Sequence, residues 1–460
     1  MSIRPEQYPA MMNELRSAFD QGLTRALAWR RQQLDALERM LRENEAAIDA
    51  ALAADLDKPR QEVLLGEVAL LLSEIKHARH RLARWSRPRR VSTPMVGQPG
   101  SSWVQPEPLG LVLIMGAWNY PVQLILAPLI PAIAAGNAAV LKPSEIAEHT
   151  AALIAELVPR YLDSRAIRVV EGAVEETTEL LKQRFDHIFY TGGAAVGRII
   201  MRAAAEHLTP VTLELGGKSP CVIDRGADLR SAARRLVWGK CLNAGQTCIA
   251  PDYVLVHPED RPALIEAMRA ELEAMYGEDR LASPDYCKII NRRHFDRLVG
   301  YLGHGQIAIG GGSDPASERI EPTVLIDVSP DDPVMQEEIF GPILPVLTID
   351  SLEQAIEFIR EREKPLSAYL FTRSRKSERR FESAISTGNL CINDVLMFMS
   401  VPDLPFGGVG ESGMGQYHGQ AGFDRLSHLK SVMRRGRWPE VTVRFAPYSN
   451  FKMKLLKLLG

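Results

Sequence analysis

Hydrophobic positions change their period near residue 110 of the chain. Over residues 11–85, apolar side chains such as Leu34, Leu41 and Ile48 keep one face apolar, with charged residues between them. That spacing is typical of amphipathic helices. The range 87–110 is instead rich in Pro, Gly and Ser, with short β-like pieces. It predicts an extended arm or hairpin outside a core.

From residue 111 onward, short continuous apolar runs alternate with helix-like stretches. The predicted strands are residues 111–115, 138–141, 167–170, 187–190, 220–223, 253–256, 323–326, 368–371 and 390–392, and the Gly-rich residues 305–314 predict a surface turn or hairpin. Continuous apolar strands that alternate with helices indicate parallel sheets covered on both faces, so we expect an α/β fold. Residues 111–210 predict a nucleotide-binding type of domain, and residues 211–407 predict a second α/β domain.

Length and composition narrow the class of protein. A chain of 460 residues exceeds one ordinary core, and its net charge of −2 gives no indication of a nucleic-acid partner. The N-terminal stretch has no apolar core of signal-peptide length, and no apolar run reaches the roughly 18 residues that span a bilayer. Five cysteines without a CxxC or HxxxH pattern favour a reducing, cytoplasmic setting over a disulfide scaffold or a metal site.

Two glycine runs resemble phosphate loops. Gly408–Gly413 matches G-x-G-x-x-G but lacks a preceding strand and a following helix, so we expect an irregular loop there. Gly192, Gly193 and Gly197 have P-loop-like spacing, yet Arg198 stands where the lysine should be, which argues against ATP hydrolysis. Because this run follows a strand and opens a helix, it predicts either a pyrophosphate site or a structural turn.

One cysteine lies among small polar residues in the stretch 239–252, GKCLNAGQTCIAPD. A thiolate nucleophile needs an accessible, polar setting, and Cys248 fits that requirement. The alternative is a small buried loop residue. Cys221 and Cys391 fall in predicted strands and are expected to be buried and inert, whereas Cys287 is expected in a surface loop.

Two further polar residues are associated with predicted strands. Glu214 lies within an apolar strand just before two glycines, where burial would raise its pKa and suit a general base. A structural ion pair with a nearby Lys or Arg is the alternative. Asn119, in GAWNYP, follows the first strand of the α/β region, where its amide could donate to a developing oxyanion.

Seven motifs occur in the order found in one family: GAWNYP, AAGNAAVLKPSE, YTGGAAVG, VTLELGGKSP, NAGQTC, EEIFGP and LPFGGVGESGMG. From about residue 11 to residue 446 the chain resembles the aldehyde dehydrogenase superfamily. The YHG…FDRLSH segment resembles the class 3 branch of fatty and aromatic aldehyde dehydrogenases, which is similar to bacterial coniferyl aldehyde dehydrogenases.

The resemblance implies a domain organisation. It consists of a Rossmann-type NAD(P)-binding domain, an α/β catalytic domain, a small β oligomerisation arm and a C-terminal tail. The expected boundaries are 1–88 with 111–210, then 211–407, then bridging strands at 89–110 and 430–448, and a tail at 449–460. Exposed strands at 87–110 and 440–448 would pair across a subunit interface, so a homodimer is expected.

The resemblance also implies roles for individual residues. Cys248 matches the nucleophile, Glu214 the general base, and Asn119 the side-chain half of the oxyanion hole, with the backbone N–H of Cys248 as the other half. The cofactor-binding positions are Lys142 and Glu145 for the adenosine ribose, Gly192, Gly193 and Gly197 for the pyrophosphate, and Glu338 and Phe340 for the nicotinamide ribose and ring. NAD is expected because Glu145 would repel a 2′-phosphate, with NADP as the second candidate.

The implied reaction oxidises an aldehyde to a carboxylic acid through a Cys248 thiohemiacetal and thioester, which water activated by Glu214 then hydrolyses. One rival is a coenzyme A-acylating enzyme, but family members of that type usually lack the general-base Glu. Another is a catalytically silent structural member, but such proteins tend to lose motif residues, and none is lost here.

The sequence leaves more than one interpretation open for the substrate class and for the role of the C-terminal tail. Tyr120, Trp238 and Phe406, with Trp118 and Phe398, could line an apolar tunnel for an aromatic or medium- to long-chain aliphatic aldehyde, or could be ordinary core aromatics. The tail NFKMKLLKLLG is basic and amphipathic. It predicts contact with a lipid surface or a substrate mouth, or alternatively a disordered or subunit-packed terminus.

Overall fold

The computed structural model describes residues 3–438, 440 and 442–459. Its N-terminal part is helical, with Leu34, Leu37 and Leu41 fully buried, which confirms the apolar stripe. A π-helical turn at Leu64–Val68 joins two of these helices. The helices are α1 (Tyr8–Asp20), α2 (Leu27–Glu43), α3 (Glu45–Leu56), α4 (Arg60–Val63) and α5 (Ala69–Trp85).

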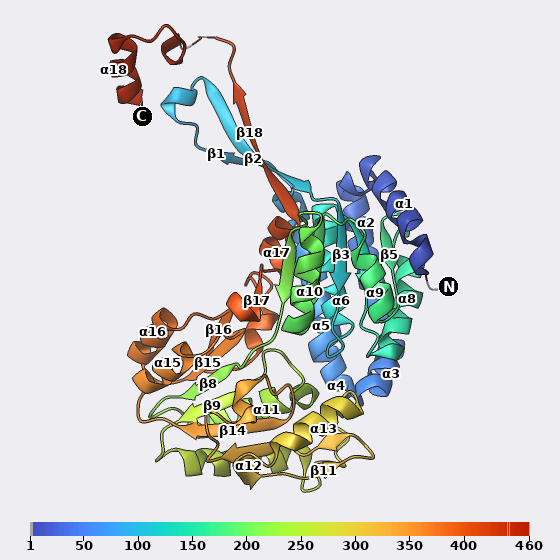
Figure 1. The fold of residues 1–460 in the computed structure, drawn as a ribbon, viewed down its shortest axis with the longest axis vertical. Helices are drawn as coiled ribbons and strands as arrows, with labels where there is room; N and C mark the ends of the chain where they lie inside the picture. Colours follow the sequence, from blue (N-terminus) through green and yellow to red (C-terminus); the bar gives the residue numbers. More distant parts are fainter. Residues whose placement is uncertain (1–2, 439, 441, 460) are drawn as a thin grey trace.

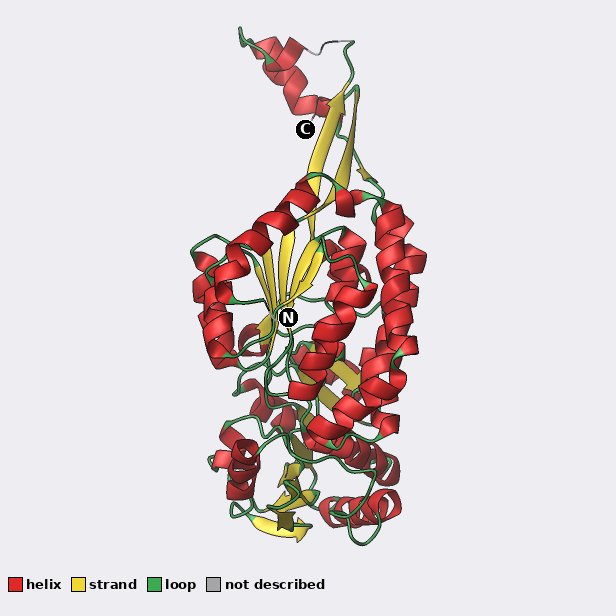
Figure 2. Ribbon diagram, turned by 90° about the vertical axis from the view of Figure 1, so that its right-hand side faces the viewer, coloured by secondary structure: helices red, strands yellow, loops and turns green. Residues whose placement is uncertain are grey.

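The first α/β unit is a six-stranded sheet in the order β17-β7-β6-β3-β4-β5, parallel except for β17. Its strands are β3 (Leu111–Met115), β4 (Ala138–Lys142), β5 (Ile167–Val169), β6 (His187–Thr191), β7 (Val211–Glu214) and β17 (Gly413–Met414). Its helices are α6 (Gln123–Leu126), α7 (Leu129–Ala135), α8 (Glu148–Tyr161), α9 (Val174–Leu181), α10 (Ala194–Ala205) and α17 (Gly419–Arg425). Helices flank the sheet on both sides (Figure 2), as the continuous apolar strands predict.

The second α/β unit is a seven-stranded sheet in the order β10-β13-β14-β9-β8-β15-β16, parallel except for β10. Its strands are β8 (Pro220–Ile223), β9 (Tyr253–Val256), β10 (Gln306–Ile309), β13 (Thr323–Ile326), β14 (Ile343–Thr348), β15 (Ser367–Phe371) and β16 (Asn389–Ile392). Its helices are α11 (Leu229–Cys241), α12 (Arg261–Tyr276), α13 (Arg292–Tyr301), α14 (Pro333–Gln336), α15 (Leu352–Arg360) and α16 (Arg375–Ala384). The α/β expectation is confirmed.

A third sheet projects as an arm from the end of the first α/β unit that lies away from the second (Figure 1). It consists of β1 (Arg89–Val91), β2 (Gly100–Pro108) and β18 (Ser427–Arg435). The long pairing between β18 and β2 is antiparallel. A separate two-stranded hairpin belongs to the second unit and consists of β11 (Ser313–Asp314) and β12 (Arg319–Ile320).

Three expectations about local structure are corrected. The strand expected at 440–448 is wrong, because Thr442–Arg444 form a 3₁₀ turn and the strand lies earlier, at Ser427–Arg435; residues 439 and 441 are outside the described range. Residues 306–309 of the expected surface turn or hairpin instead form β10, an edge strand of the seven-stranded sheet that pairs with β13. Cys287 is fully buried rather than in a surface loop.

The tail forms helix α18 (Asn450–Leu459), and Lys452 Nζ donates to the carbonyl oxygens of Phe445 and Pro447, at 2.9 Å each. Figure 1 shows this helix at the far end of the arm, away from both α/β units. Within the described residues, no helix is long and apolar enough to cross a membrane.

Candidate active site

A cavity of about 340 Å³ receives side chains from both α/β units and from the π-helical turn. Cys248 and Glu214 both line it, although Glu214 ends a strand of the first sheet and Cys248 follows a helix of the second unit. Tyr120, Trp238 and Phe406 line it as well. The structure therefore brings these predicted site residues together at one largely apolar cavity.

The loop before Cys248 has an unusual backbone. Asn243, Ala244 and Gly245 all have positive φ, at 53°, 51° and 73°. Non-glycine residues in this region carry strain, which persists where the surroundings hold the chain in place. A Cβ on Gly245 would approach the carbonyl group of Gly341 and the carbonyl oxygen of Lys240, so the backbone packs too closely for any side chain there.

Hydrogen bonds fix this loop from several directions. Gln246 Nε2 donates to the carbonyl oxygens of Asn243 and Lys288, at 3.0 Å each. Thr247 Oγ1 lies 2.8 Å from the hydroxyl of Tyr120. Tyr369 donates to the carbonyl oxygen of Ile249 at 2.5 Å. These bonds explain why polar residues surround the thiol, because their side chains bind the loop that carries Cys248.

Cys248 itself is half-buried and its thiol has a raised pKa. Burial is the main cause, and the nearby carboxylates of Glu338 and Glu214 add to it. The backbone N–H groups of Cys248 and Ile249 act in the opposite direction and lower the pKa. Because burial has the larger effect, the thiol is protonated at rest.

Glu214 ends β7 and is 3% exposed. Among the residues that the structure describes, neither of its carboxylate oxygens has a hydrogen-bond partner. The pKa of Glu214 is raised well above its usual range by burial. The structural ion pair considered from the sequence is therefore not formed in the described part of the chain, and an unpartnered carboxyl group faces the cavity.

Asn119 lies behind the cavity wall rather than in it. Its Nδ2 donates to the carbonyl oxygen of Gln246 at 3.1 Å. Its backbone carbonyl oxygen accepts from Lys58 Nζ and from Asn243 Nδ2, at 2.9 Å each. The side-chain amide thus lies against the loop that carries Cys248, although Asn119 is not a lining residue of the cavity.

The predicted cofactor residues of the first unit lie beyond the carboxyl ends of its strands. Lys142 ends β4, and its Nζ lies 3.4 Å from Glu145 Oε2; burial lowers the pKa of Lys142. Gly192 follows β6, and Gly193 precedes α10 with open space around it. Gly197 is buried within α10 beneath Leu215. Ligands of open parallel sheets bind along this edge.

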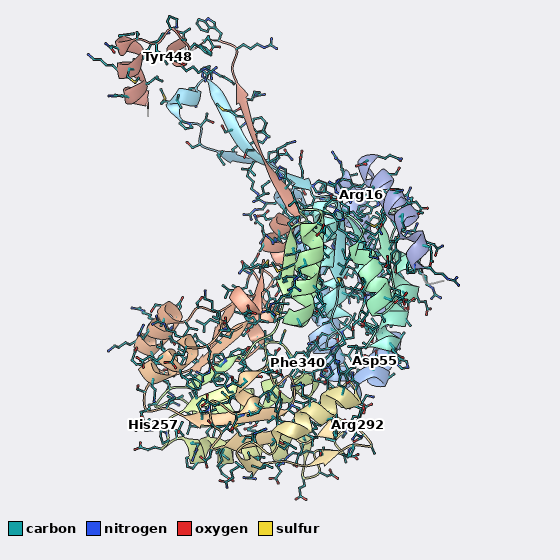
Figure 3. All side chains as sticks on the ribbon, in the orientation of Figure 1. Arg16, Asp55, His257, Arg292, Phe340 and Tyr448 are labelled. Atoms are coloured by element: carbon teal, nitrogen blue, oxygen red, sulfur yellow. The ribbon has the colours of Figure 1, made fainter. Side chains whose placement is uncertain are left out.

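Glu338 and Phe340 lie in the loop between α14 and β14. The pKa of Glu338 is raised to about 8, mainly by burial and then by Asp252, and its carboxylate lies over Gly216, where a Cβ would collide with it. Phe340 has a φ of 50° and packs edge-on against Trp118 at 5.3 Å. Figure 3 shows Phe340 near the junction of the two α/β units.

Two of the proposed tunnel aromatics do not line the cavity. Trp118 packs between Phe340 and His294. Phe398 stacks between Tyr369 and Phe406, with ring centroids 6.4 and 6.2 Å away. Phe398 therefore supports the lining residue Phe406 from behind, and Trp118 supports Phe340.

The sequence did not single out several residues at the site. Tyr417 and Gln123 line the cavity, and Leu65 and Gly66 reach it from the π-helical turn. Tyr417 is the first residue of the YHG segment, which carried a signal of family branch but not of position. The Gly408–Gly413 run forms the expected irregular loop and lets β17 pair directly beside Glu214.

Comparison with known proteins agrees with this geometry. Residues 2–432 match the model of the aldehyde dehydrogenase family. The chain is 50% identical to aldehyde dehydrogenase family 3 member A2 of Rattus norvegicus, over 97% of this chain and 93% of the relative. It is also 50% identical to the Rattus norvegicus protein named aldehyde dehydrogenase, dimeric NADP-preferring, over 91% of this chain and 92% of that protein.

The solved structure of Staphylococcus aureus AldH in its substrate-bound state superposes with a TM-score of 0.95. The two chains are 43% identical, and the superposition covers 100% of this chain and 99% of the other. The chain therefore belongs to the aldehyde dehydrogenase family and is similar over nearly its whole length to family 3 members.

Proposed function

We propose that this chain oxidises an apolar aldehyde, aromatic or medium- to long-chain aliphatic, to its carboxylic acid with NAD or NADP. The observation that carries the proposal is that Cys248 and the unpartnered Glu214 line one apolar cavity. Membership of the aldehyde dehydrogenase family supports the reaction class. A catalytically silent member of the fold is disfavoured, because the thiol of Cys248, the carboxyl group of Glu214 and the amide of Asn119 are all present and lie close to one loop.

Cys248 is the proposed nucleophile. Its thiol loses a proton to water, the thiolate adds to the aldehyde carbon, and a thiohemiacetal oxyanion forms. Glu214 lies on the same cavity wall, and its carboxylate form, made more basic by the raised pKa, acts later in deacylation. Asn119 and the backbone N–H of Cys248 are the proposed donors to the oxyanion.

The cofactor residues fit a dinucleotide. Gly193 leaves open space before α10, whose first N–H groups have no side-chain cap. Lys142 and Glu145 offer a cation and an acceptor for the adenosine ribose, and Glu338 and Phe340 would hold the nicotinamide half. A bound oxidised nicotinamide supplies the acceptor for the hydride that the aldehyde carbon loses.

The proposed cofactor unit is residues 1–88 with 111–210, and the proposed catalytic unit is residues 211–407. NAD is the first candidate because the Glu145 carboxylate would repel a 2′-phosphate. NADP is retained because a relative at 50% identity is named NADP-preferring.

Deacylation follows from the same carboxyl group. In its ionised form Glu214 takes a proton from water, the resulting hydroxide attacks the Cys248 thioester, and the acid leaves as the thiolate is restored. A coenzyme A-acylating enzyme would not need this base. The buried and otherwise unused carboxyl group of Glu214 therefore favours hydrolysis.

The arm supports a homodimer. β18 and β16 are edge strands of their sheets within the described residues, and apolar side chains on the arm, among them Met95 and Met433, are more than half exposed. Unpaired strand edges, and exposed apolar side chains such as these methionines, mark interaction surfaces. A relative at 50% identity is named dimeric. Light scattering should give twice the chain mass, and a monomer would contradict the assignment.

The tail supports a peripheral contact with a lipid surface. In α18, Phe451 and Met453 are exposed, and lysines alternate with apolar residues at the end of the arm. The full chain should sediment with anionic vesicles more than a chain shortened by residues 450–460. Equal sedimentation of both would remove the proposal.

Steady-state formation of reduced cofactor with benzaldehyde and decanal tests the proposed function. Cys248→Ala should abolish turnover, and Glu214→Gln should slow it strongly, whereas Cys391→Ala, the matched half-buried cysteine of β16, should leave it unchanged. Full activity of Cys248→Ala would reject the proposal.

A further inference from the structure

A fully buried ion pair lies behind the Asn119 loop. Lys58 Nζ donates to Glu67 Oε1 at 2.7 Å, and both side chains are completely buried. Lys58 follows α3, and Glu67 lies in the π-helical turn that interrupts the helix between α4 and α5. π-Helical turns within helices often occur at functional sites. The pair is not part of the cavity lining, so the chemistry described above does not use it.

The pair directs its remaining hydrogen-bonding groups to one short backbone segment. Lys58 Nζ donates to the carbonyl oxygen of Asn119 at 2.9 Å and lies 4.2 Å from the ring centroid of Tyr120. Glu67 Oε2 accepts from the backbone N–H groups of Val122 and Gln123, at 3.1 and 2.8 Å. The cation and the carboxylate therefore hold residues 119–123 from both ends.

The anchored segment carries two groups that touch the nucleophile's loop. Asn119 Nδ2 donates to the carbonyl oxygen of Gln246, and the Tyr120 hydroxyl lies 2.8 Å from Thr247 Oγ1. Gln246 and Thr247 directly precede Cys248. A shift of residues 119–123 would thus move the amide and the phenol relative to the sulfur.

Stability alone is a poor reason for such a pair. Removing two charges from water costs about as much as their mutual attraction returns, so apolar residues of similar size often stabilise a protein equally well. Positioning is a better reason, because catalytic groups must be held within about 0.5 Å of their productive geometry. The contacts of Lys58 and Glu67 are concentrated on the segment where such precision matters.

We propose that Lys58 and Glu67 are positioning residues that set the place of the Asn119 amide and the Tyr120 side chain relative to Cys248. This inference rests on the role proposed for Asn119. Neither residue touches substrate or cofactor, and both act through the backbone of residues 119–123.

The test uses the double variant Lys58→Met/Glu67→Gln in the full chain. Removing both charges avoids leaving one buried and uncompensated, and the introduced glutamine retains a side-chain oxygen for the N–H groups of Val122 and Gln123. We expect kcat/KM for benzaldehyde to fall about 10- to 100-fold, less than the loss from deleting an oxyanion donor outright. Cofactor KM and the thermal midpoint should stay near those of the wild type.

The control Arg280→Met/Glu321→Gln removes a partly buried ion pair of the second unit and should keep kcat/KM.

A double-mutant cycle with Asn119→Ala separates positioning from a general structural role. If the pair acts through Asn119, its removal in the Asn119→Ala background should change kcat/KM by no more than about twofold. An undiminished loss in that background would overturn the inference, as would a double variant with wild-type kcat/KM. Should the double variant fail to fold, Glu67→Asp, which keeps the charge balance but shortens the reach to Val122 and Gln123, carries the same cycle, with an expected loss of about 10-fold.

The outcomes also distinguish this inference from the proposed function. Wild-type kcat/KM in Asn119→Ala would overturn the oxyanion assignment and the positioning inference together. A slow Asn119→Ala variant beside an unimpaired double variant would overturn only the positioning of the segment. Activity in Cys248→Ala would reject the reaction scheme itself.

Discussion

Replacing Gly245 with Ala should strongly reduce kcat, because it moves the loop that carries Cys248. The φ of Gly245 is 73°, and an added Cβ would lie 2.5 Å from the carbonyl carbon of Gly341 and 2.9 Å from the carbonyl oxygen of Lys240. Ordinary carbon–carbon contacts begin near ~3.5 Å, so the loop must move by roughly 1 Å. Both obstacles are backbone atoms and cannot rotate away. A misplacement of about 1 Å near a nucleophile costs on the order of 100-fold in rate, which is the loss of kcat expected here.

A matched glycine isolates this effect. Gly226 has nearly the same φ, 77°, but a Cβ there would meet nothing within 4 Å. Gly226→Ala therefore carries the left-handed strain, about 1–2 kcal/mol, without the collision. Steady-state kinetics and thermal unfolding of both variants give the comparison. If Gly245→Ala retained wild-type kcat, or lost no more than Gly226→Ala, the packing argument for the Cys248 loop would be refuted.

Three other perturbations have defined outcomes. Because burial raises the pKa of Glu214 in the folded protein, the native state loses stability as pH rises above 4.5, the pKa of this group in the unfolded chain. Glu214→Gln should therefore have a larger free energy of unfolding than the wild type at neutral pH, and this gain should vanish near pH 4.5. Urea unfolding at a series of pH values checks this. Trp238→Ala should raise KM for benzaldehyde severalfold more than KM for decanal, because it widens the cavity, and equal changes would contradict its lining role. Because α18 lies away from both α/β units of its own chain, a substrate role for the tail requires contact across the proposed homodimer; deleting residues 450–460 should then raise KM for decanal but not for benzaldehyde, and unchanged kinetics would exclude that role.

Much of the fold follows from local pattern. The predicted strands 111–115, 220–223 and 253–256 coincide with β3, β8 and β9, because strands buried on both faces read as uninterrupted apolar runs. The first two strands of the arm follow from the composition of residues 87–110, but its last strand, β18, does not. β18 is polar and mostly exposed, and its pairing with β2 joins segments more than 300 residues apart. Such pairing depends on tertiary contacts that no local period records.

The residues of the site also fall into those that a local sequence pattern reveals and those that it does not. Glu214 and Asn119 stand out because a polar residue falls within or soon after an apolar run, and Cys248 stands out because a thiol lies among small polar residues. Lys58 and Glu67 do not, because their importance lies in contacts made across the fold. Cys287 was misplaced for a similar reason, because its thiol donates a hydrogen bond to the Glu62 carboxylate, a contact between distant parts of the chain that no local pattern records.

The central claim is that Cys248 forms the acyl intermediate that Glu214 resolves. The most direct measurement is intact and peptide mass spectrometry of Glu214→Gln after mixing with NAD and benzaldehyde. The account predicts a benzoyl adduct on the peptide that contains residue 248, with one reduced cofactor formed per site. Reduced cofactor without any adduct on that peptide, or an adduct on another cysteine, would contradict it.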